Sequence, residues 1–275
     1  MVDADAVCYR HPDHPAAVGC QRCGRPICSQ CTRPASVGFH CPDCVRATGQ
    51  RVVRGRDLTP GRSATIAILA INAVVFVLQL SGGNGTVRIG SGITYDGVLF
   101  GPLVADGEYW RLLTSGFLHG SVPHLLLNSW ALWIFGPLVE ARFGRWRMLA
   151  IYLAGLFGGS ALVMLFNWSE PTLGASAAVL GLGGALVASM TVQGVSPRSN
   201  SLLGVLLINL LLPLLLPSIS FWGHLGGMGA GFVAGYLAAS LDPPRRSPAA
   251  SLLPLLGLVV ALAVVGVLVA EAGGA

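Results

Sequence analysis

Seven apolar segments, each close to the length that a bilayer requires, follow one another along this chain and constrain its fold more than any other feature. They cover approximately residues 64–80, 123–139, 148–168, 173–192, 202–216, 221–241 and 252–270. A transmembrane helix needs about 20 apolar residues, so two short segments could be re-entrant or tilted. Of all residues 53% are hydrophobic and only 11% are charged, against roughly 25% charged in soluble domains. The sequence therefore predicts an all-α polytopic membrane protein.

The arginines predict how these segments are oriented. They form clusters before segment one (Arg51, Arg54, Arg56, Arg62), after segment two (Arg142, Arg145, Arg147), after segment four (Arg198) and after segment six (Arg245, Arg246). Positive charge collects on the cytoplasmic side of membrane proteins. We expect a multi-pass protein of the cell membrane with a cytoplasmic N-terminus and an external C-terminus. The net charge of +5 then reflects orientation in the bilayer, and no nucleic-acid partner is expected.

The first fifty residues form a different module, because they hold all seven cysteines. Four ligand pairs recur at the same spacing: Cys8 and His11, Cys20 and Cys23, Cys28 and Cys31, Cys41 and Cys44. Eight such ligands suffice for two tetrahedral Zn²⁺ sites. A disulfide framework is the alternative, but the odd cysteine count and the cytoplasmic placement disfavour it. His14 and His40 are spare ligands that could replace a member, and so small a unit would need the metal to fold.

Polar side chains that could do chemistry lie in the first turns of three apolar segments. His124 and Asn128 open segment two, Ser176 opens segment four and His224 opens segment six. These segments all run in one direction across the membrane, so the four groups should lie at one shallow depth. A lone serine at a helix start is usually a cap, but the joint placement favours a serine and histidine dyad without a carboxylate. Gly174, Ala178 and Gly181 on segment four, and Gly227, Gly231 and Gly235 on segment six, predict close helix packing.

From Trp110 to Leu241 the chain resembles the rhomboid family of intramembrane serine proteases. The motifs occur in the family's order: Trp110-Arg111, His119-x4-His124-x3-Asn128, Gly136-x3-Glu140-x3-Gly144, Gly174-x-Ser176, and His224-x2-Gly227-x3-Gly231. The resemblance implies that Ser176 is the nucleophile and His224 the general base. It also implies that His124, Asn128 and the Ser176 N–H bind the oxyanion, and that the Trp110-Arg111 pair is structural. Two positions depart from the family, Ala177 where Gly is frequent and Leu180 where an aromatic residue often packs on the histidine.

The cysteine module resembles a B-box-like zinc finger, which implies that pairs one and three share one metal and pairs two and four the other. The expected domains are a cytoplasmic zinc-binding domain at 1–50, a basic linker at 51–62, a six-helix core at 63–242 and one more transmembrane helix at 249–271. Two structural Zn²⁺ ions are expected, and no cofactor for catalysis.

The predicted function is an endopeptidase that cleaves transmembrane protein substrates near the outer membrane boundary. Its expected partners are these substrates, the lipid bilayer and a cytoplasmic partner of the zinc module. The alternative is an inactive relative that binds and routes transmembrane clients. A transporter fits less well, because its polar groups should cluster at the midplane.

Overall fold

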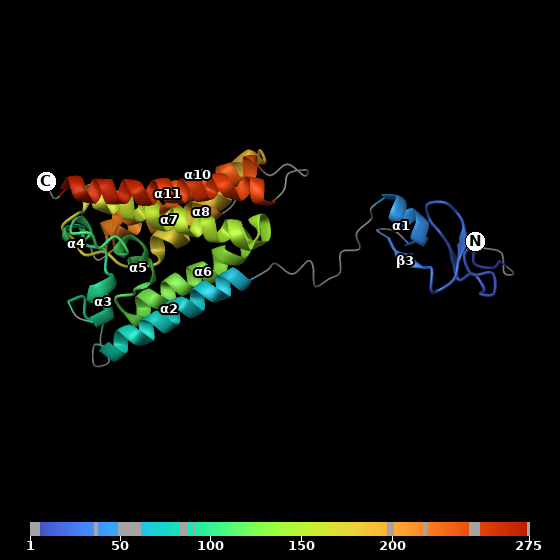
Figure 1. Ribbon diagram of the computed structural model, residues 1–275, viewed down its shortest axis with the longest axis horizontal. Helices are drawn as coiled ribbons and strands as arrows, with labels where there is room; N and C mark the ends of the chain where they lie inside the picture. The colour runs from blue at the N-terminus through green and yellow to red at the C-terminus, as the bar shows by residue number, and fades with distance from the viewer. Residues whose placement is uncertain are drawn as a thin grey trace. The chain divides into compact units, whose positions relative to one another are not determined.

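A computed structural model describes residues 6–35, 38–48, 62–82, 87–90, 92–196, 201–216, 219–241 and 248–273. The chain divides into two compact units, Met1–Thr59 and Pro60–Ala275 (Figure 1). Most of the predicted linker, residues 51–61, lies outside the described residues, as do Arg198, Arg245 and Arg246.

The N-terminal unit is built from very short elements. Strand β1 (Val18–Gly19) pairs antiparallel with β2 (Pro26–Ile27), β3 (Arg33–Pro34) pairs antiparallel with β4 (Phe39–His40), and helix α1 (Pro42–Thr48) follows. None of the seven cysteines forms a disulfide bond. Among the residues of this unit that the structure describes, the buried core consists of five cysteines and Ile27. So little apolar surface cannot offset the entropy of ordering the chain, and the cysteine groups must supply the rest.

Each of the seven predicted segments forms one helix in the second unit. These are α2 (Ser63–Gly82), α6 (Val122–Phe143), α7 (Arg145–Phe166), α8 (Ser176–Val192), α9 (Ser201–Leu211), α10 (Phe221–Ser240) and α11 (Pro248–Gly273). Among the described residues, α2, α6, α7 and α11 are long and apolar enough to span a membrane, while α8 and α9 are shorter apolar helices. The unit is a polytopic helical membrane domain, as predicted.

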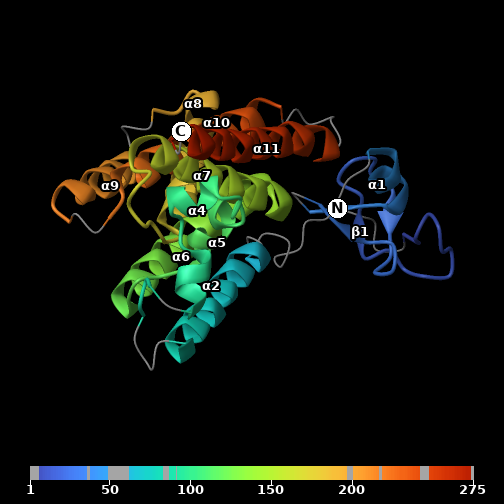
Figure 2. The same ribbon diagram turned by 60° about the vertical axis from the view of Figure 1, so that its left-hand side comes forward.

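The helices pack in two connected groups. Helix α10 packs against both α8 and α7, and α11 covers α7 on another side (Figures 1 and 2). Helix α2 runs beside α6. The buried Glu140 near the end of α6 joins that pair, because its carboxylate accepts hydrogen bonds from Ser63 Oγ at 3.0 Å and from the N–H groups of Ala64 and Thr65 at 3.2 Å. Glu140 therefore caps the start of α2 and has a structural role.

The segment between α2 and α6 is a folded loop. It contains α3 (Gly92–Gly97), α4 (Gly101–Ala105), α5 (Arg111–Thr114) and a 3₁₀ turn at Ser115–Phe117. Arg111 is 1% exposed, forms an ion pair with Glu108 and donates to the carbonyl oxygen of Val98 at 2.9 Å. A buried guanidinium group that is paired and hydrogen-bonded holds its surroundings in place. The structural role predicted for Arg111 is thus confirmed.

Small residues allow α8 and α10 to touch along their backbones. A Cβ added at Gly231 would lie 2.1 Å from the Gly181 carbonyl oxygen, and one at Gly235 would lie 2.4 Å from the Cα of Ala185. No side chain beyond hydrogen fits at either position. The two helices run parallel, since successive turns of one meet successive turns of the other. The predicted close packing of these two segments is confirmed.

Candidate active site

Ser176 is the first residue of α8, three residues later than the predicted start of that segment. The difference arises at Gly174, because its φ of +129° is incompatible with an α-helix. Residues that carry a Cβ rarely adopt such a φ, whereas glycine can. The N–H of Gly174 donates to the Ser115 carbonyl oxygen at 2.9 Å. Ala175 precedes the helix and provides no side-chain cap. The first N–H groups of α8, including that of Ser176, therefore lack helical acceptors and can bind an anion.

His224 lies in the first turn of α10 and is 5% exposed. Its Nδ1 atom lies 3.0 Å from the main-chain carbonyl oxygen of Asn209 on α9. A carbonyl oxygen can only accept, so Nδ1 must carry the proton of the neutral ring. The Nε2 atom is then an unprotonated acceptor, and it has no hydrogen-bond partner among the described residues. This is the state that a general base requires.

His124, in the first turn of α6, is arranged in the opposite way. The N–H of Gly120 donates to its Nδ1 atom at 3.3 Å. Because Nδ1 accepts, Nε2 of the neutral ring must carry the proton and act as a donor. A Cβ added at Gly174 would lie 2.8 Å from this Nε2 atom and 3.9 Å from Ser176 Oγ. The donor and the hydroxyl therefore flank the space above Gly174.

Asn128 follows His124 by one helical turn and is 7% exposed. Its Nδ2 atom donates to the His124 carbonyl oxygen at 3.0 Å. A side-chain amide has two N–H donors, so this bond orients the group and leaves the second donor available. His124 and Asn128 thus present two donors from one face of α6.

The first turns of α8 and α10 are in direct contact next to Ser176 and His224. A Cβ added at Gly227 would lie 2.2 Å from the Ala177 carbonyl oxygen. A Cβ added at Gly159 of α7 would lie 2.5 Å from Ala177 Cβ and 2.8 Å from the Gly223 carbonyl oxygen. The Ala177 methyl group therefore occupies space that Gly159 leaves open. It packs toward α7, and Leu180 is buried in the core.

Ser176 and His224 are not hydrogen-bonded to each other in this structure, since His224 Nε2 has no partner among the described residues. Catalytic hydrogen bonds are often long without substrate and shorten only in the reacting complex.

His119 lies just before α6 and supports the His124 region. Its side chain is fully buried, and the two imidazole rings meet edge to face with centroids 5.2 Å apart. Neither ring nitrogen has a partner among the described residues. Burial, together with the nearby His124, lowers the pKa of His119 to about 4. The ring is therefore neutral at neutral pH, and it contacts the proposed site through His124.

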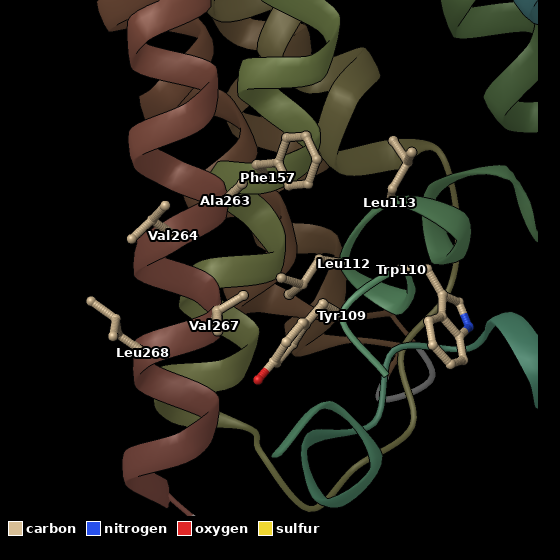
Figure 3. A pocket seen from close by; sticks show the side chains of 9 residues that line it. All are labelled: Tyr109, Trp110, Leu112, Leu113, Phe157, Ala263, Val264, Val267 and Leu268. Carbon is tan, nitrogen blue, oxygen red and sulfur yellow. The ribbon is translucent and has the colours of Figure 1, made fainter. Parts of the chain in front are cut away.

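One described pocket lies apart from this site. It has a volume of about 440 Å³ and opens between α11, α7 and the loop that leads into α5 (Figure 3). Its lining is largely apolar, and the hydroxyl of Tyr109 in that lining donates to Glu271 Oε1 at 2.7 Å. None of Ser176, His224, His124 and Asn128 lines it.

Two groups of metal-ligating side chains lie in the N-terminal unit. One contains Cys8, His11, Cys28 and Cys31, and the other contains Cys20, Cys23, Cys41 and Cys44. In each group all ligand atoms lie within 4.8 Å of one another. The first ligand pair therefore lies beside the third, and the second beside the fourth, which is the pairing that the resemblance to a B-box-like zinc finger implies. Neither group includes the spare ligands His14 and His40.

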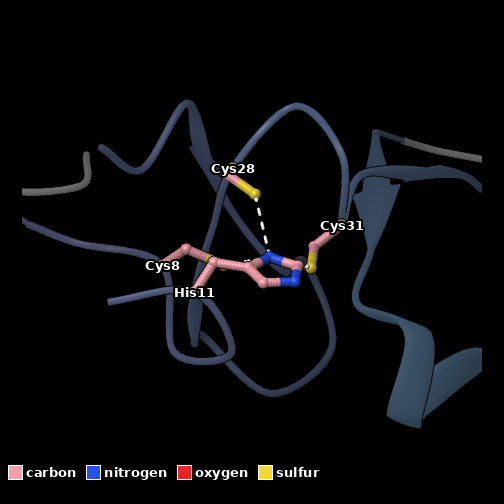
Figure 4. A group of neighbouring side chains, drawn as sticks. All are labelled: Cys8, His11, Cys28 and Cys31. Atoms are coloured by element: carbon pink, nitrogen blue, oxygen red, sulfur yellow. Dashed lines mark hydrogen bonds between the residues drawn. The ribbon is translucent and has the colours of Figure 1, made fainter. Parts of the chain in front are cut away.

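The spacing within each group suits a tetrahedral metal ion. In the first group His11 Nδ1 lies 3.5 Å from Cys28 Sγ and 3.3 Å from Cys31 Sγ (Figure 4). In the second, the sulfur atoms of Cys23 and Cys41 are 3.8 Å apart. A tetrahedron with metal–sulfur bonds of about 2.3 Å has an edge of about 3.8 Å. Both groups can therefore hold a metal ion without rearrangement.

The surroundings favour the thiolate, the form that binds metals, at Cys8 of the first group and Cys20 of the second, whereas burial raises the pKa of Cys31 to about 11 and that of Cys44 to about 12. Burial by itself would raise the pKa of the Cys8 thiol, but backbone N–H groups of Cys28, Arg10 and His11 lower it to about 6. In the second group the N–H of Cys41 donates to Cys20 Sγ at 3.2 Å. Burial by itself would raise the pKa of the Cys20 thiol, but this bond and other backbone N–H groups outweigh it and lower the pKa to about 6.

Fold and site together define a class: a polytopic helical membrane protein with serine, histidine and asparagine side chains gathered at one end of its helices, preceded by a metal-binding module. Comparison with known proteins agrees with this, since residues 106–241 match the Rhomboid domain. Residues 106–241 therefore form a domain of the rhomboid family.

Several curated relatives support the assignment. "Rhomboid protease GluP" of Bacillus subtilis (strain 168) is 33% identical over 204 residues, which are 73% of this chain and 39% of that protein. "RHOMBOID-like protein 6, mitochondrial" of Arabidopsis thaliana is 37% identical over 140 residues, 49% of this chain and 45% of that protein. "RHOMBOID-like protein 4" of the same plant is 34% identical over 149 residues, 52% of this chain and 38% of that protein. The chain thus spans about two fifths of the length of these relatives.

Proposed function

We propose that this protein is an intramembrane serine endopeptidase that cleaves transmembrane protein substrates. Ser176 is the nucleophile, His224 the general base, and His124, Asn128 and the Ser176 N–H are the oxyanion donors. The observation that carries the proposal is the opposite protonation of two histidines. The partner of His224 makes its Nε2 an acceptor, whereas the partner of His124 makes its Nε2 a donor.

These two states fit the two roles in peptide hydrolysis. His224 Nε2 takes the proton of Ser176 as Oγ attacks the scissile carbonyl carbon, and the carbonyl oxygen becomes an oxyanion. His124 Nε2–H and the Asn128 amide donate to that oxygen. His224 then gives its proton to the leaving amine, which breaks the peptide bond and leaves an acyl-enzyme. Water hydrolyses this ester by the same sequence of proton transfers. The chain's own residues suffice, and no cofactor takes part.

The proposed site faces the outside of the cell. Arg62 precedes α2, and the capping of α2 by Glu140 places this arginine at the end of α6 opposite to His124. Arg142 and Arg145 lie at that same far end. Positive residues favour the cytoplasmic side, so the N-terminus is cytoplasmic and Ser176 lies near the external surface. Water can reach the site there, and substrates are cut near their outer boundary.

The N-terminal unit is proposed to bind two structural Zn²⁺ ions. Each group offers four thiolate or imidazole ligands and keeps no open position, as in structural zinc sites. Its proposed role is a docking surface for a cytoplasmic partner. The proposed domains are the zinc module at 1–50, the linker at 51–62, the six-helix core at 63–242 and the additional helix at 249–271.

The assignment of the nucleophile can be tested with a serine-reactive fluorophosphonate probe on purified protein in detergent. Wild-type protein should be labelled, Ser176→Ala should not, and His224→Ala should be labelled far more slowly. Ser169→Ala changes an exposed serine of the loop before α8 and should keep full labelling. Labelling of Ser176→Ala at the wild-type rate would refute the assignment.

A second function, binding and routing transmembrane clients without cleavage, is favoured by one observation, the missing hydrogen bond between Ser176 and His224. Probe labelling combined with pull-down and cleavage of a transmembrane substrate separates the two. A client binder would retain a transmembrane substrate in pull-down while showing neither probe labelling nor cleavage.

A further inference from the structure

The proposed base depends on a helix that contributes none of the proposed catalytic side chains. Asn209 lies on α9, and its main-chain oxygen is the acceptor for His224 Nδ1. The Asn209 side chain is engaged elsewhere, because its Nδ2 atom donates to the Val205 carbonyl oxygen at 2.8 Å. The backbone of α9, and not a polar side chain, therefore sets the protonation of the His224 ring.

A proline explains why this carbonyl group is available. In an α-helix the oxygen of residue 209 would accept from the N–H of residue 213. Residue 213 is proline, which has no N–H and cannot make this bond. Helix α9 ends at Leu211, and the chain tightens into a 3₁₀ turn at Leu212–Leu214 with Pro213 buried. The Asn209 oxygen is thus left at a helix end, where backbone acceptors seek partners outside the helix.

We propose that Pro213 and the Asn209 carbonyl group are positioning residues for His224. Pro213 deprives the carbonyl oxygen of its helical partner, and the oxygen holds the Nδ1 proton of His224. Serine proteases of the triad type use a buried carboxylate for this purpose. The first turns of α6, α8 and α10 hold no carboxylate, and a main-chain oxygen takes its place. The effect on catalysis rests on the proposed function, whereas the protonation of His224 on Nδ1 does not.

Loss of this bond would change which nitrogen of the His224 ring carries the proton. A neutral imidazole carries its proton on either nitrogen, and the partner of one nitrogen decides which. Without the Asn209 acceptor, the form with a proton on Nε2 becomes accessible. That form cannot take a proton from Ser176, so the active fraction of the enzyme falls while substrate binding is unchanged.

The test is Pro213→Ala in the full-length protein, which supplies the missing N–H and lets residue 213 compete for the Asn209 oxygen. Nitrogen NMR of ¹⁵N-histidine-labelled protein in detergent distinguishes the two ring forms, and the His224 signals are identified by their loss in His224→Ala. Wild-type His224 should be protonated on Nδ1, and Pro213→Ala should shift it toward a mixture. The kcat for a model transmembrane substrate should fall about tenfold, with KM nearly unchanged.

Pro254→Ala is the matched control, because it also replaces a proline inside an apolar helix, here the exposed face of α11. It should alter neither the His224 signals nor kcat. Pro213→Gly also supplies an N–H and replaces Pro213→Ala in the test if that variant does not fold. Wild-type His224 protonated on Nε2, or an unchanged ring form in folded Pro213 variants, would overturn the inference. Inactive wild-type protein with Nδ1-protonated His224 would instead refute the proposed protease and leave the positioning role intact.

Discussion

A side chain at Gly174 would collide with His124, since its Cβ would lie 2.8 Å from both Cε1 and Nε2 of that ring. The same Cβ would lie 3.9 Å from Ser176 Oγ. The absence of a side chain at Gly174 therefore keeps open the space between the proposed nucleophile and one proposed oxyanion donor. It also permits the φ of +129° from which α8 begins.

We therefore expect Gly174→Ala to reduce kcat/KM at least about 100-fold, because the methyl group would fill the position of the oxyanion and displace His124, a loss comparable to that of one oxyanion donor. The strained backbone should cost about 1–3 kcal/mol. Gly194→Ala is the control, since Gly194 also has positive φ, +70°, but open space around it. The measurement is cleavage of a model substrate beside thermal unfolding. Equal activities of the two variants would contradict the role of Gly174.

The two proposed side-chain oxyanion donors should affect the rate more than binding. His124→Ala and Asn128→Ala should each lower kcat by about 10²–10³ with little change in KM, because a lost donor of this kind costs about 2.7–4 kcal/mol in the transition state. Leu127→Ala changes an exposed residue of the same helix and should have no effect. A rise in KM at constant kcat would mean that these residues bind substrate and do not stabilise the intermediate.

His119 should make the membrane domain sensitive to acid. Its folded pKa of about 4 lies below the ordinary value of about 6.5, so the unfolded chain binds the proton more readily. This contribution to stability is complete above about pH 6.5 and is lost as the pH falls toward 4. His119→Gln should therefore show a smaller drop in unfolding temperature between about pH 7.5 and about pH 4.5 than wild type. Parallel pH profiles of the two proteins would contradict the burial of an uncharged ring.

Metal removal should unfold the N-terminal unit and leave the proposed chemistry intact. The peptide 1–50 should bind about two zinc ions and lose its structure with a chelator, because metal binding in so small a unit is its folding free energy. His11→Ala should lose about one ion, while His14→Ala should lose none. A truncated protein that starts at Thr59 should still cleave a model substrate. Loss of cleavage with a folded membrane domain would show that metal and catalysis are coupled.

Reporter fusions can test the orientation that the arginines predict. A fusion after Arg246 should report the cytoplasm and one after Ala275 the outside, since α11 lies between them and is long enough to cross a bilayer. Fusions that report the same side would mean that α11 does not cross the membrane.

Much of the fold could be predicted from the sequence because its determinants are local. A bilayer requires about 20 apolar residues for each span, and that length is visible in the chain without any partner. Cys8 and His11, like Cys20 and Cys23, are separated by two residues, because at this spacing two side chains can bind the same metal ion. The sequence therefore determined the seven helices, the ligand pairs and the residue types of the proposed site.

The tertiary structure decided what depends on contacts between distant segments. The room for the Ala177 methyl group is left by Gly159 on another helix, and the start of α8 is set by the backbone of Gly174. The ring forms of His124 and His224 depend on Gly120 and Asn209, and no local pattern predicts that the Asn209 oxygen would meet His224. The sequence by itself determined which chemical groups are available, whereas only the packing of helices decided which atom of each group donates and which accepts, because a hydrogen bond depends on the position of both its partners.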